Sequence, residues 1–81
     1  MSNIKEIIEN LAAYTRNSGF TVDVNNSLST VSIANNEGEG FFLQGHEAQE
    51  FIDDCKQLAE THDINVETVF LSTAKNYIDC L

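Results

Sequence analysis

The residues with the clearest potential for chemistry are the acids between Glu47 and Asp54. Glu47, Glu50 and Asp54 are spaced at i, i+3 and i+7, so in a helix they lie on one side, with Asp53 at its edge. A rise of about 1.5 Å per residue places them roughly 4.5 and 6 Å apart along the axis. That resembles the charge spacing of a nucleic-acid strand, which is about 3.4 Å per nucleotide in projection and wider through space. Acid–base catalysis would instead require two carboxyl groups in unlike environments, and these acids all occupy polar positions.

The expected role of these acids is therefore binding by charge. A row of carboxylates on a helix would imitate phosphates and occupy a basic groove of a partner protein, and the acids of the preceding loop would extend the row. The alternative is a solvated helix face, in which the helix dipole favours Glu47 and Glu50 near the first turn. The predicted partner-binding residues are Glu37, Glu39, Glu47, Glu50, Asp53 and Asp54.

No other cluster predicts catalysis or a metal site. His46 and His62 flank the same predicted helix, 16 positions apart. That is roughly 24 Å along a straight helix, so the two cannot share an ion. Cys55 falls on an apolar helical position where a small thiol is inert, and neither Cys55 nor Cys80 has a histidine beside it in the sequence. We therefore expect a protein that is not an enzyme, with no catalytic residue, no metal and no cofactor.

The composition limits the class of partner. The 81 residues carry four Lys and Arg against 13 Asp and Glu, which gives a formal net charge of −9. Nucleic acid as a direct partner is excluded, because phosphate binding requires basic side chains, and an anionic membrane surface would repel the chain. The sequence predicts neither a signal peptide nor a membrane-spanning helix. Two cysteines are too few for a secreted disulfide scaffold, so the expected location is the cytoplasm of a bacterial cell.

Hydrophobic periodicity predicts a helix at the start of the chain. Ile4, Ile7, Ile8 and Leu11 have the spacing of one buried stripe. Asn3 is the expected N-cap, with an acid three positions later as in a capping box. A glycine at position 19 suits a left-handed C-terminal cap.

The period then changes to two, which predicts three short strands over residues 20–25, 29–33 and 41–44. Asn25 and Asn26 are expected to form the first turn, because asparagine tolerates positive φ. The polar segment NNEGEG, residues 35–40, is the expected second hairpin loop. Phe41 and Phe42 are adjacent, so one of them should face away from the buried side of the sheet unless the first helix covers it. The pair is either core or, if exposed, part of a surface for a dimer or another partner.

Two further helices complete the prediction, with Gly45 opening the first and Asn65 capping the second. The whole chain, residues 1–81, is thus expected to form a single α+β domain: a helix, a three-stranded antiparallel meander and two C-terminal helices. Leu71, Ile78 and Leu81 widen the apolar stripe of the last helix. These three residues are either core or an exposed surface for a dimer or another partner.

This element order and charge resemble small phage-encoded inhibitors of bacterial defence, in particular the acidic type II-A anti-CRISPR proteins. The segment FFLQGHEAQEFIDDC also resembles a strand–turn–helix segment of phage proteins. The resemblance implies inhibition without catalysis, by carboxylates presented to the basic groove with which a nuclease reads DNA. The chain departs from that family in its last helix, which carries only Glu67 and Asp79 as acids.

Two functions follow as hypotheses. In the first, the protein is a non-enzymatic phage-type inhibitor that binds a host defence protein with a basic surface, such as a nuclease or another nucleic-acid-binding complex. In the second, it is a small homodimeric adaptor whose acids serve only solubility, and which associates through the last helix or a free sheet edge.

Overall fold

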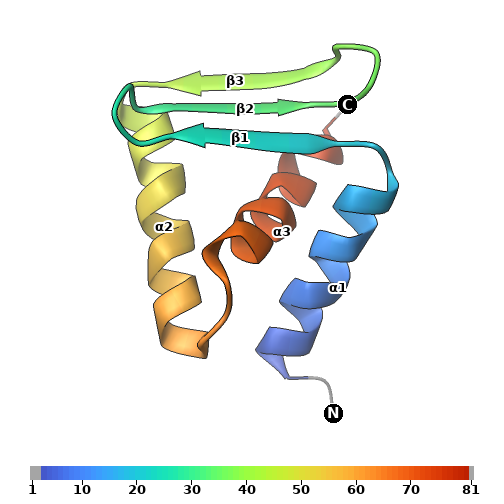
Figure 1. Cartoon of the computed structure of the whole chain (residues 1–81), viewed down its shortest axis with the longest axis vertical. Helices are drawn as coiled ribbons and strands as arrows, with labels where there is room; N and C mark the ends of the chain where they lie inside the picture. The colour runs from blue at the N-terminus through green and yellow to red at the C-terminus, as the bar shows by residue number, and fades with distance from the viewer. Residues whose placement is uncertain (1–2, 81) are drawn as a thin grey trace.

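The computed structural model describes residues 3–80 and confirms the predicted α+β order (Figure 1). One helix is followed by three strands and two further helices, with no other element between them in this range. The element bounds are α1 Ile4–Asn17, β1 Thr21–Asn25, β2 Thr30–Ala34, β3 Gly40–Gln44, α2 His46–His62 and α3 Val66–Ile78.

The three strands form an antiparallel meander in the order β1-β2-β3. Val31, Ile33 and Leu43 point to the helices and are buried, as the two-residue period predicts. Phe42 points to the opposite face, where it lies opposite Ser32 and is 62% exposed. The expectation that one of the two adjacent phenylalanines faces away from the core is therefore confirmed.

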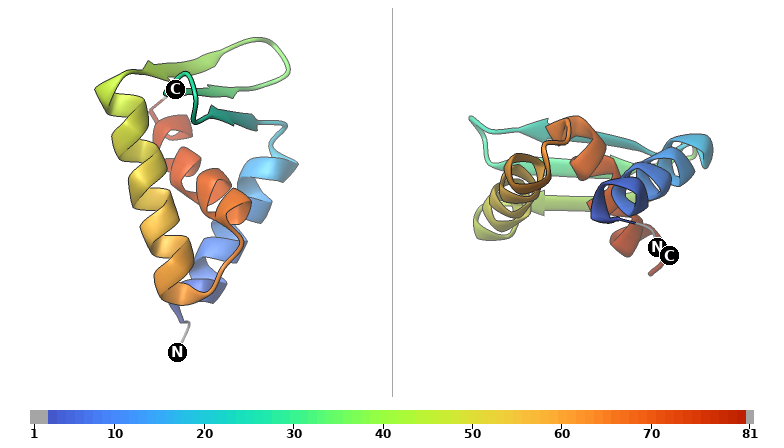
Figure 2. Two further views of the ribbon diagram at one scale, coloured as in Figure 1. Left: turned by 60° about the vertical axis from the view of Figure 1, so that its left-hand side comes forward. Right: turned by 90° about the horizontal axis from the view of Figure 1, so that it is seen from below.

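All three helices lie on one face of the sheet, and the other face is open (Figure 2). The last helix, α3, passes between α1 and α2 beneath the sheet and contacts both helices and the strands. Its Val69 and Ala74 are fully buried, as are Ile52 and Cys55 on α2. The core is therefore formed where α3 meets its neighbours.

Helix α1 begins as predicted, because the Asn3 Oδ1 accepts a hydrogen bond of 2.8 Å from the Glu6 amide. The predicted buried stripe is wrong in its first half, since Ile4 and Ile7 are 46% and 45% exposed. Among the described elements α1 packs almost wholly against one helix, α3, so its contact stripe is narrower than its apolar stripe. The residues of α1 that are buried are Ile8, Ala12 and Thr15.

The buried Thr15 joins α1 to α3 through its hydroxyl group. Its Oγ1 lies 3.0 Å from the carbonyl oxygen of Leu11 in its own helix and 3.0 Å from that of Leu71 in α3. A buried hydroxyl that reaches acceptors in this way avoids the free-energy penalty of an unpaired polar group. Position 15 continues the helical spacing of Ile8 and Leu11, but the sequence prediction followed apolar residues only and so left this threonine out.

The first hairpin differs from its prediction. Asn25 pairs with Thr30 at the end of the ladder, and the positive φ of the intervening loop belongs to Ser29, at 51°, and not to an asparagine. Asn25 acts instead through its side chain, whose Oδ1 accepts a hydrogen bond of 3.0 Å from the Leu28 amide. The prediction is therefore right for Asn26, which lies in the loop of residues 26–29, and wrong for Asn25, which ends β1 and caps the loop through its side chain without adopting a left-handed conformation.

Candidate interaction surfaces

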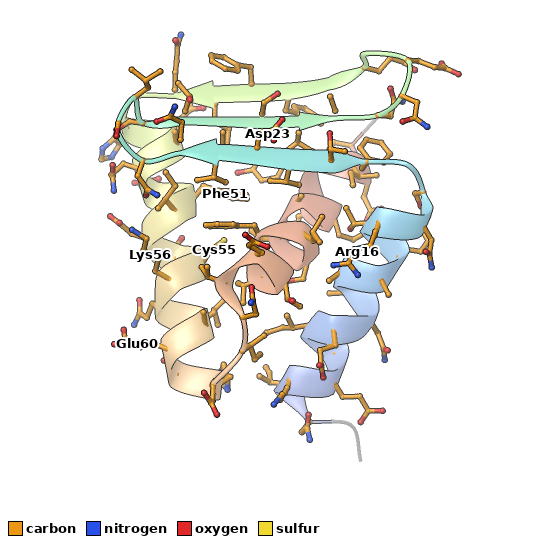
Figure 3. The ribbon with its side chains drawn as sticks, in the orientation of Figure 1. Arg16, Asp23, Phe51, Cys55, Lys56 and Glu60 are labelled. Atoms are coloured by element: carbon orange, nitrogen blue, oxygen red, sulfur yellow. The ribbon has the colours of Figure 1, made fainter. Side chains whose placement is uncertain are left out.

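Helix α2 presents one buried stripe and a wide acidic exterior. The stripe toward α3 consists of Ala48, Phe51, Ile52, Cys55 and Ala59, repeating with the helical period. Figure 3 shows Phe51 and Cys55 directed inward, and Lys56 and Glu60 on the outer side of the same helix. Five of the 13 acids of the chain lie on α2, all of them exposed: Glu47, Glu50, Asp53, Asp54 and Glu60.

Glu47, Glu50 and Asp54 form one side of this exterior, which we term the α2 acidic flank. Their charges act together on Tyr77, a residue of α3 that packs against Phe51 with ring centroids 5.9 Å apart. Burial raises the pKa of the Tyr77 hydroxyl above its ordinary value of 10.0, and Glu47 is the next largest cause, followed by Cys55, Asp54 and Glu50. The three carboxylates therefore share a local field beside the C-terminal half of α3.

The only ion pair of the flank within residues 3–80 involves a histidine. His46 Nε2 lies 3.0 Å from Glu50 Oε1, one helical turn away, and both side chains are largely exposed. This pair is charged on both sides only when the imidazole is protonated. No Lys or Arg of the described chain pairs with Glu47, Glu50 or Asp54, so the flank keeps most of its negative charge for a partner.

Asp53 lies apart from the flank, on the side of α2 that faces the first hairpin. Its Oδ1 accepts a hydrogen bond of 2.9 Å from Gln49, and Gln49 in turn accepts one of 3.2 Å from Ser29 in the loop between β1 and β2. Lys56 donates to Asn26 in the same loop, at 3.3 Å. Asp53 is therefore part of a polar contact between α2 and the sheet.

The second hairpin loop carries Glu37 and Glu39, and Asn35 shapes it. The Asn35 Oδ1 accepts hydrogen bonds from the amides of Glu37 at 2.9 Å and of Glu39 at 3.0 Å. Gly38 supplies a φ of +84°, a conformation that L side chains rarely adopt. Sequence reasoning assigned the loop correctly and missed the role of its first asparagine, although asparagine at the start of a tight turn is the usual signal.

The structure separates this loop from α2. The loop lies at one end of β3 and α2 begins at the other end, as Figure 1 shows. Five extended residues span roughly 16 Å. The six predicted partner-binding acids thus occupy three places: the hairpin loop, the α2 acidic flank and the contact around Asp53.

Of the three apolar residues in the stripe of the last helix, predicted as either core or an exposed surface, the structure describes two. Ile78 is partly buried and packs against the core cluster, and Leu71 is partly buried beside β1. Leu81 lies outside the described residues. The larger exposed apolar side chains are elsewhere in the described chain: Ile4, Ile7, Tyr14, Leu28, Phe42 and Leu58.

The two cysteines have opposite environments. Cys55 is fully buried with Sγ 3.5 Å from the Thr73 hydroxyl, and burial raises its pKa from 9.0 to about 11, so it is a poor nucleophile at neutral pH. Cys80 is exposed. Within residues 3–80, no three His, Cys, Asp or Glu side chains are grouped so as to hold a metal ion.

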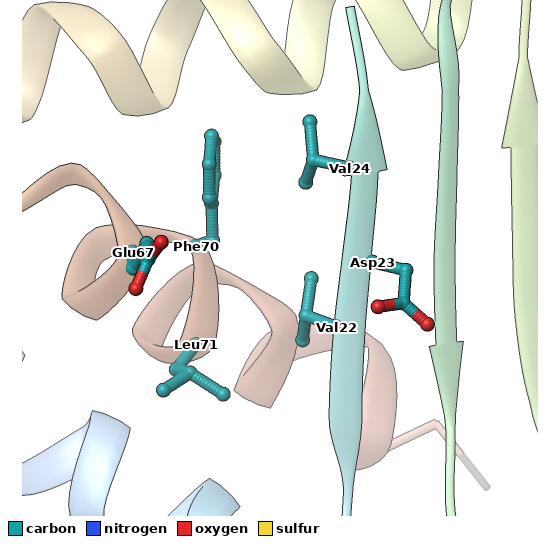
Figure 4. A pocket seen from close by; sticks show the side chains of 6 residues that line it. All are labelled: Val22, Asp23, Val24, Glu67, Phe70 and Leu71. Carbon is teal, nitrogen blue, oxygen red and sulfur yellow. The ribbon is translucent and has the colours of Figure 1, made fainter.

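A groove that sequence reasoning missed opens between β1 and the first half of α3 (Figure 4). Val22 and Val24 point from the strand toward Phe70 and Leu71 of the helix, and the hollow has a volume of about 390 Å³. Glu67 lies at its helix side, and Asp23 points away from α3 toward the open face of the sheet. The sequence signal was the alternation of valines around Asp23, which predicts the strand but not what lies opposite it.

Comparison with protein-family models, with curated proteins and with solved structures finds no match for this chain. Among residues 3–80, no helix combines the length and the apolar character required to span a bilayer.

Proposed function

We propose that this chain is a non-enzymatic inhibitor of phage type that binds a host defence protein, and that the α2 acidic flank docks on a basic, nucleic-acid-binding surface of that protein. The observation that carries the proposal is the flank itself, where Glu47, Glu50 and Asp54 are exposed together without a Lys or Arg partner in the described chain. Closely spaced carboxylates with little internal neutralisation favour association with cations and increase the rate of encounter.

The way α2 is held supports this role. Its opposite side is anchored in the core by Phe51, Ile52 and Cys55, so the acids project from a helix whose position is fixed before binding. A preformed surface loses less conformational entropy on association than a mobile one. The loop acids Glu37 and Glu39 lie at the far end of β3, and they would engage only a partner large enough to reach both places.

The homodimeric adaptor is the weaker proposal. Association through the last helix requires an apolar surface on α3, but Ile78 packs against the core and Leu71 is partly buried, which leaves little of that stripe for a second copy. Association through a free sheet edge is the other route, and it would bring the acidic chains together. Light scattering over a range of protein concentrations measures this directly. A tight dimer that is abolished by changing Ile78 to a polar residue would support the adaptor.

The inhibitor proposal is tested by comparing three baits in a bacterial lysate: the unaltered chain, E47Q/E50Q/D54N, and the matched control E6Q/E9Q/E60Q. Both variants change the formal charge from −9 to −6 at exposed positions. The proposal expects a nucleic-acid-binding protein that is captured by the unaltered chain and by the control, but not by the flank variant. The captured protein should lose its nucleic acid in competition with the unaltered chain. Equal capture by all three baits would contradict docking through the flank.

A further inference from the structure

The free edge of β1 has backbone groups available for pairing. At odd-numbered residues of β2, the backbone N–H and C=O groups point toward β3. Two hydrogen bonds just beyond the ends of β2 show this: the Asn35 amide donates to the Glu39 carbonyl oxygen at 2.9 Å, and the Gly45 amide donates to the Ser29 carbonyl oxygen at 3.0 Å. Directions alternate along a strand, so the even-numbered residues of β2 turn toward β1.

The register then fixes which residues of β1 remain unpaired. The even-numbered residues of β2 lie opposite Thr21, Asp23 and Asn25, which leaves the N–H and C=O groups of Val22 and Val24 directed outward from the sheet. No hydrogen bond to another part of residues 3–80 uses these groups. The same two residues direct their side chains into the groove toward Phe70 and Leu71. Backbone pairing and an apolar hollow are thus offered by the same edge.

We infer that β1 binds an extended segment of a partner protein as a fourth, antiparallel strand, and that this segment alternates apolar with basic residues. The apolar side chains would fill the groove against Val22, Val24 and Phe70. The intervening basic side chains would lie on the open face of the sheet beside Asp23. Main-chain hydrogen bonds supply affinity in this mode of recognition, and the pockets for alternate side chains supply specificity.

The negative charge of this edge favours a basic segment as the occupant over a second copy of this chain. In an antiparallel pairing of two β1 strands about their centres, Asp23 would face the Asp23 of the other copy, and like charges directly opposite one another destabilise a pair of strands. Two chains of formal charge −9 also repel each other. Asp23 is exposed on the open face of the sheet and Glu67 is exposed at the helix side of the groove, so both faces of the β1 edge carry a charge that complements cationic side chains.

The inference does not depend on the α2 acidic flank and is tested separately from it. The probe is a fluorescent peptide of sequence TKVRLKT, in which valine and leucine would point into the groove. N-methylation of its valine and leucine removes the amides that would donate to β1, and should weaken binding at least about tenfold. N-methylation of its arginine, whose amide would point away from β1, is the matched control and should change the affinity by less than about twofold.

Variants of the protein locate the site. D23N/E67Q should weaken binding of TKVRLKT about threefold to tenfold at low salt, because both changes remove charge beside the groove. E47Q/E50Q removes the same charge from the α2 acidic flank and should leave the affinity within about twofold. Hydrogen exchange should also slow at the Val22 and Val24 amides when the peptide is bound.

Four results would overturn the inference, and the last of them concerns the α2 acidic flank. The first is equal binding of the two N-methylated peptides, or of the scrambled peptide TKKRVLT. The second is no binding of TKVRLKT at about 1 mM protein. The third is a protein dimer that forms in light scattering and excludes the peptide, since a second copy would then occupy the edge. Loss of binding in E47Q/E50Q alone would assign the peptide to the flank and would leave the proposed function standing.

Discussion

Helices α2 and α3 are neighbours in the sequence and differ in how much of their surface is in contact. Within α3 only Glu67 and Asn76 are exposed, since α1, α2 and the sheet surround it. Helix α2 is buried on one stripe and carries exposed acids over the rest of its surface. The number of neighbours that a helix has, more than its own periodicity, therefore decides which of its positions are free for binding.

This difference separates stability from binding. Substitutions on almost any side of α3 should lower the free energy of unfolding. On α2, only substitutions in the buried stripe should do so. The exterior of α2 should tolerate changes with little effect on folding and alter only association.

The buried stripe of α2 should be as sensitive as any part of the core. Ile52 is fully buried, and Ile52→Ala should lower the free energy of unfolding by about 3 kcal/mol, because it removes apolar contacts and leaves a cavity. Gln57→Ala on the exposed side of the same helix should change it by less than about 0.5 kcal/mol. Urea denaturation measures both. Similar losses for the two variants would contradict the division of α2 into a buried and a free side.

A larger side chain on the buried surface of α3 should destabilise the protein. Ala74 is fully buried, so Ala74→Leu should lower the free energy of unfolding by about 2 kcal/mol through overpacking. Asn76→Ala, two positions away at an exposed site, is the control and should be nearly neutral. An unchanged midpoint of thermal unfolding in the Ala74→Leu variant would show that the neighbours of α3 leave room for a larger side chain at this position.

The buried thiol between the two helices should make stability fall at alkaline pH. The folded-state pKa of Cys55, about 11, exceeds its ordinary value of 9.0, so its contribution is complete below about pH 9 and is lost as pH rises toward 11. The free energy of unfolding of the unaltered chain, relative to that of a Cys55→Ala variant, should therefore be about 1 kcal/mol lower at pH 10 than at neutral pH. The pKa of Tyr77 is also raised, so its ionisation lowers the free energy of unfolding at alkaline pH as well. The same pH titration of a Tyr77→Phe variant measures the contribution of Cys55 without it.

Reactivity of the two thiols provides a second measurement of this environment. A thiol reagent at neutral pH should modify the exposed Cys80 quickly and Cys55 only upon unfolding. Rapid modification of both in the folded protein would contradict the burial of Cys55.

The smallest effect on folding is expected from the α2 acidic flank. The variant E47Q/E50Q/D54N should change the free energy of unfolding by less than about 0.5 kcal/mol, because all three side chains are exposed. Its binding to a basic partner should nevertheless weaken, and should lose much of its dependence on salt. A large loss of stability would indicate that the flank holds the fold together, and it would remove the clearest distinction between α2 and α3.

Much of the fold could be predicted from local signals in the sequence. The caps at Asn3 and Asn65 and the glycine turn at Gly45 act over a few residues, and the structure confirms all three. The alternation of the strands also gave the buried face of the sheet. The exposed Ile4 and Ile7 could not be predicted, because their burial depends on which neighbour covers α1.

The candidate sites were less predictable for the same physical reason. Helical spacing brought Glu47, Glu50 and Asp54 together correctly, but it could not reveal that β3 separates Glu37 and Glu39 from them. The groove depends on Val22 and Phe70, which are 48 positions apart in the sequence and meet only through the packing of α3 under β1. Periodicity describes one element at a time, whereas both of these features are relations between elements.

The second hairpin has a consequence for recognising distant relatives. A Cβ atom at Gly40 would lie 1.7 Å from the Ile33 carbonyl oxygen, so no other residue fits there without opening the pairing of β2 and β3. The Asn35 side-chain oxygen, which accepts hydrogen bonds from two loop amides, and the positive φ of Gly38 add to this, so the hairpin favours the pattern N-x-x-G-x-G between two short strands. In a diverged relative the glycine at position 40 should persist most strictly, because a Cβ atom meets backbone there. Aspartate at position 35 could accept the same two hydrogen bonds as the asparagine.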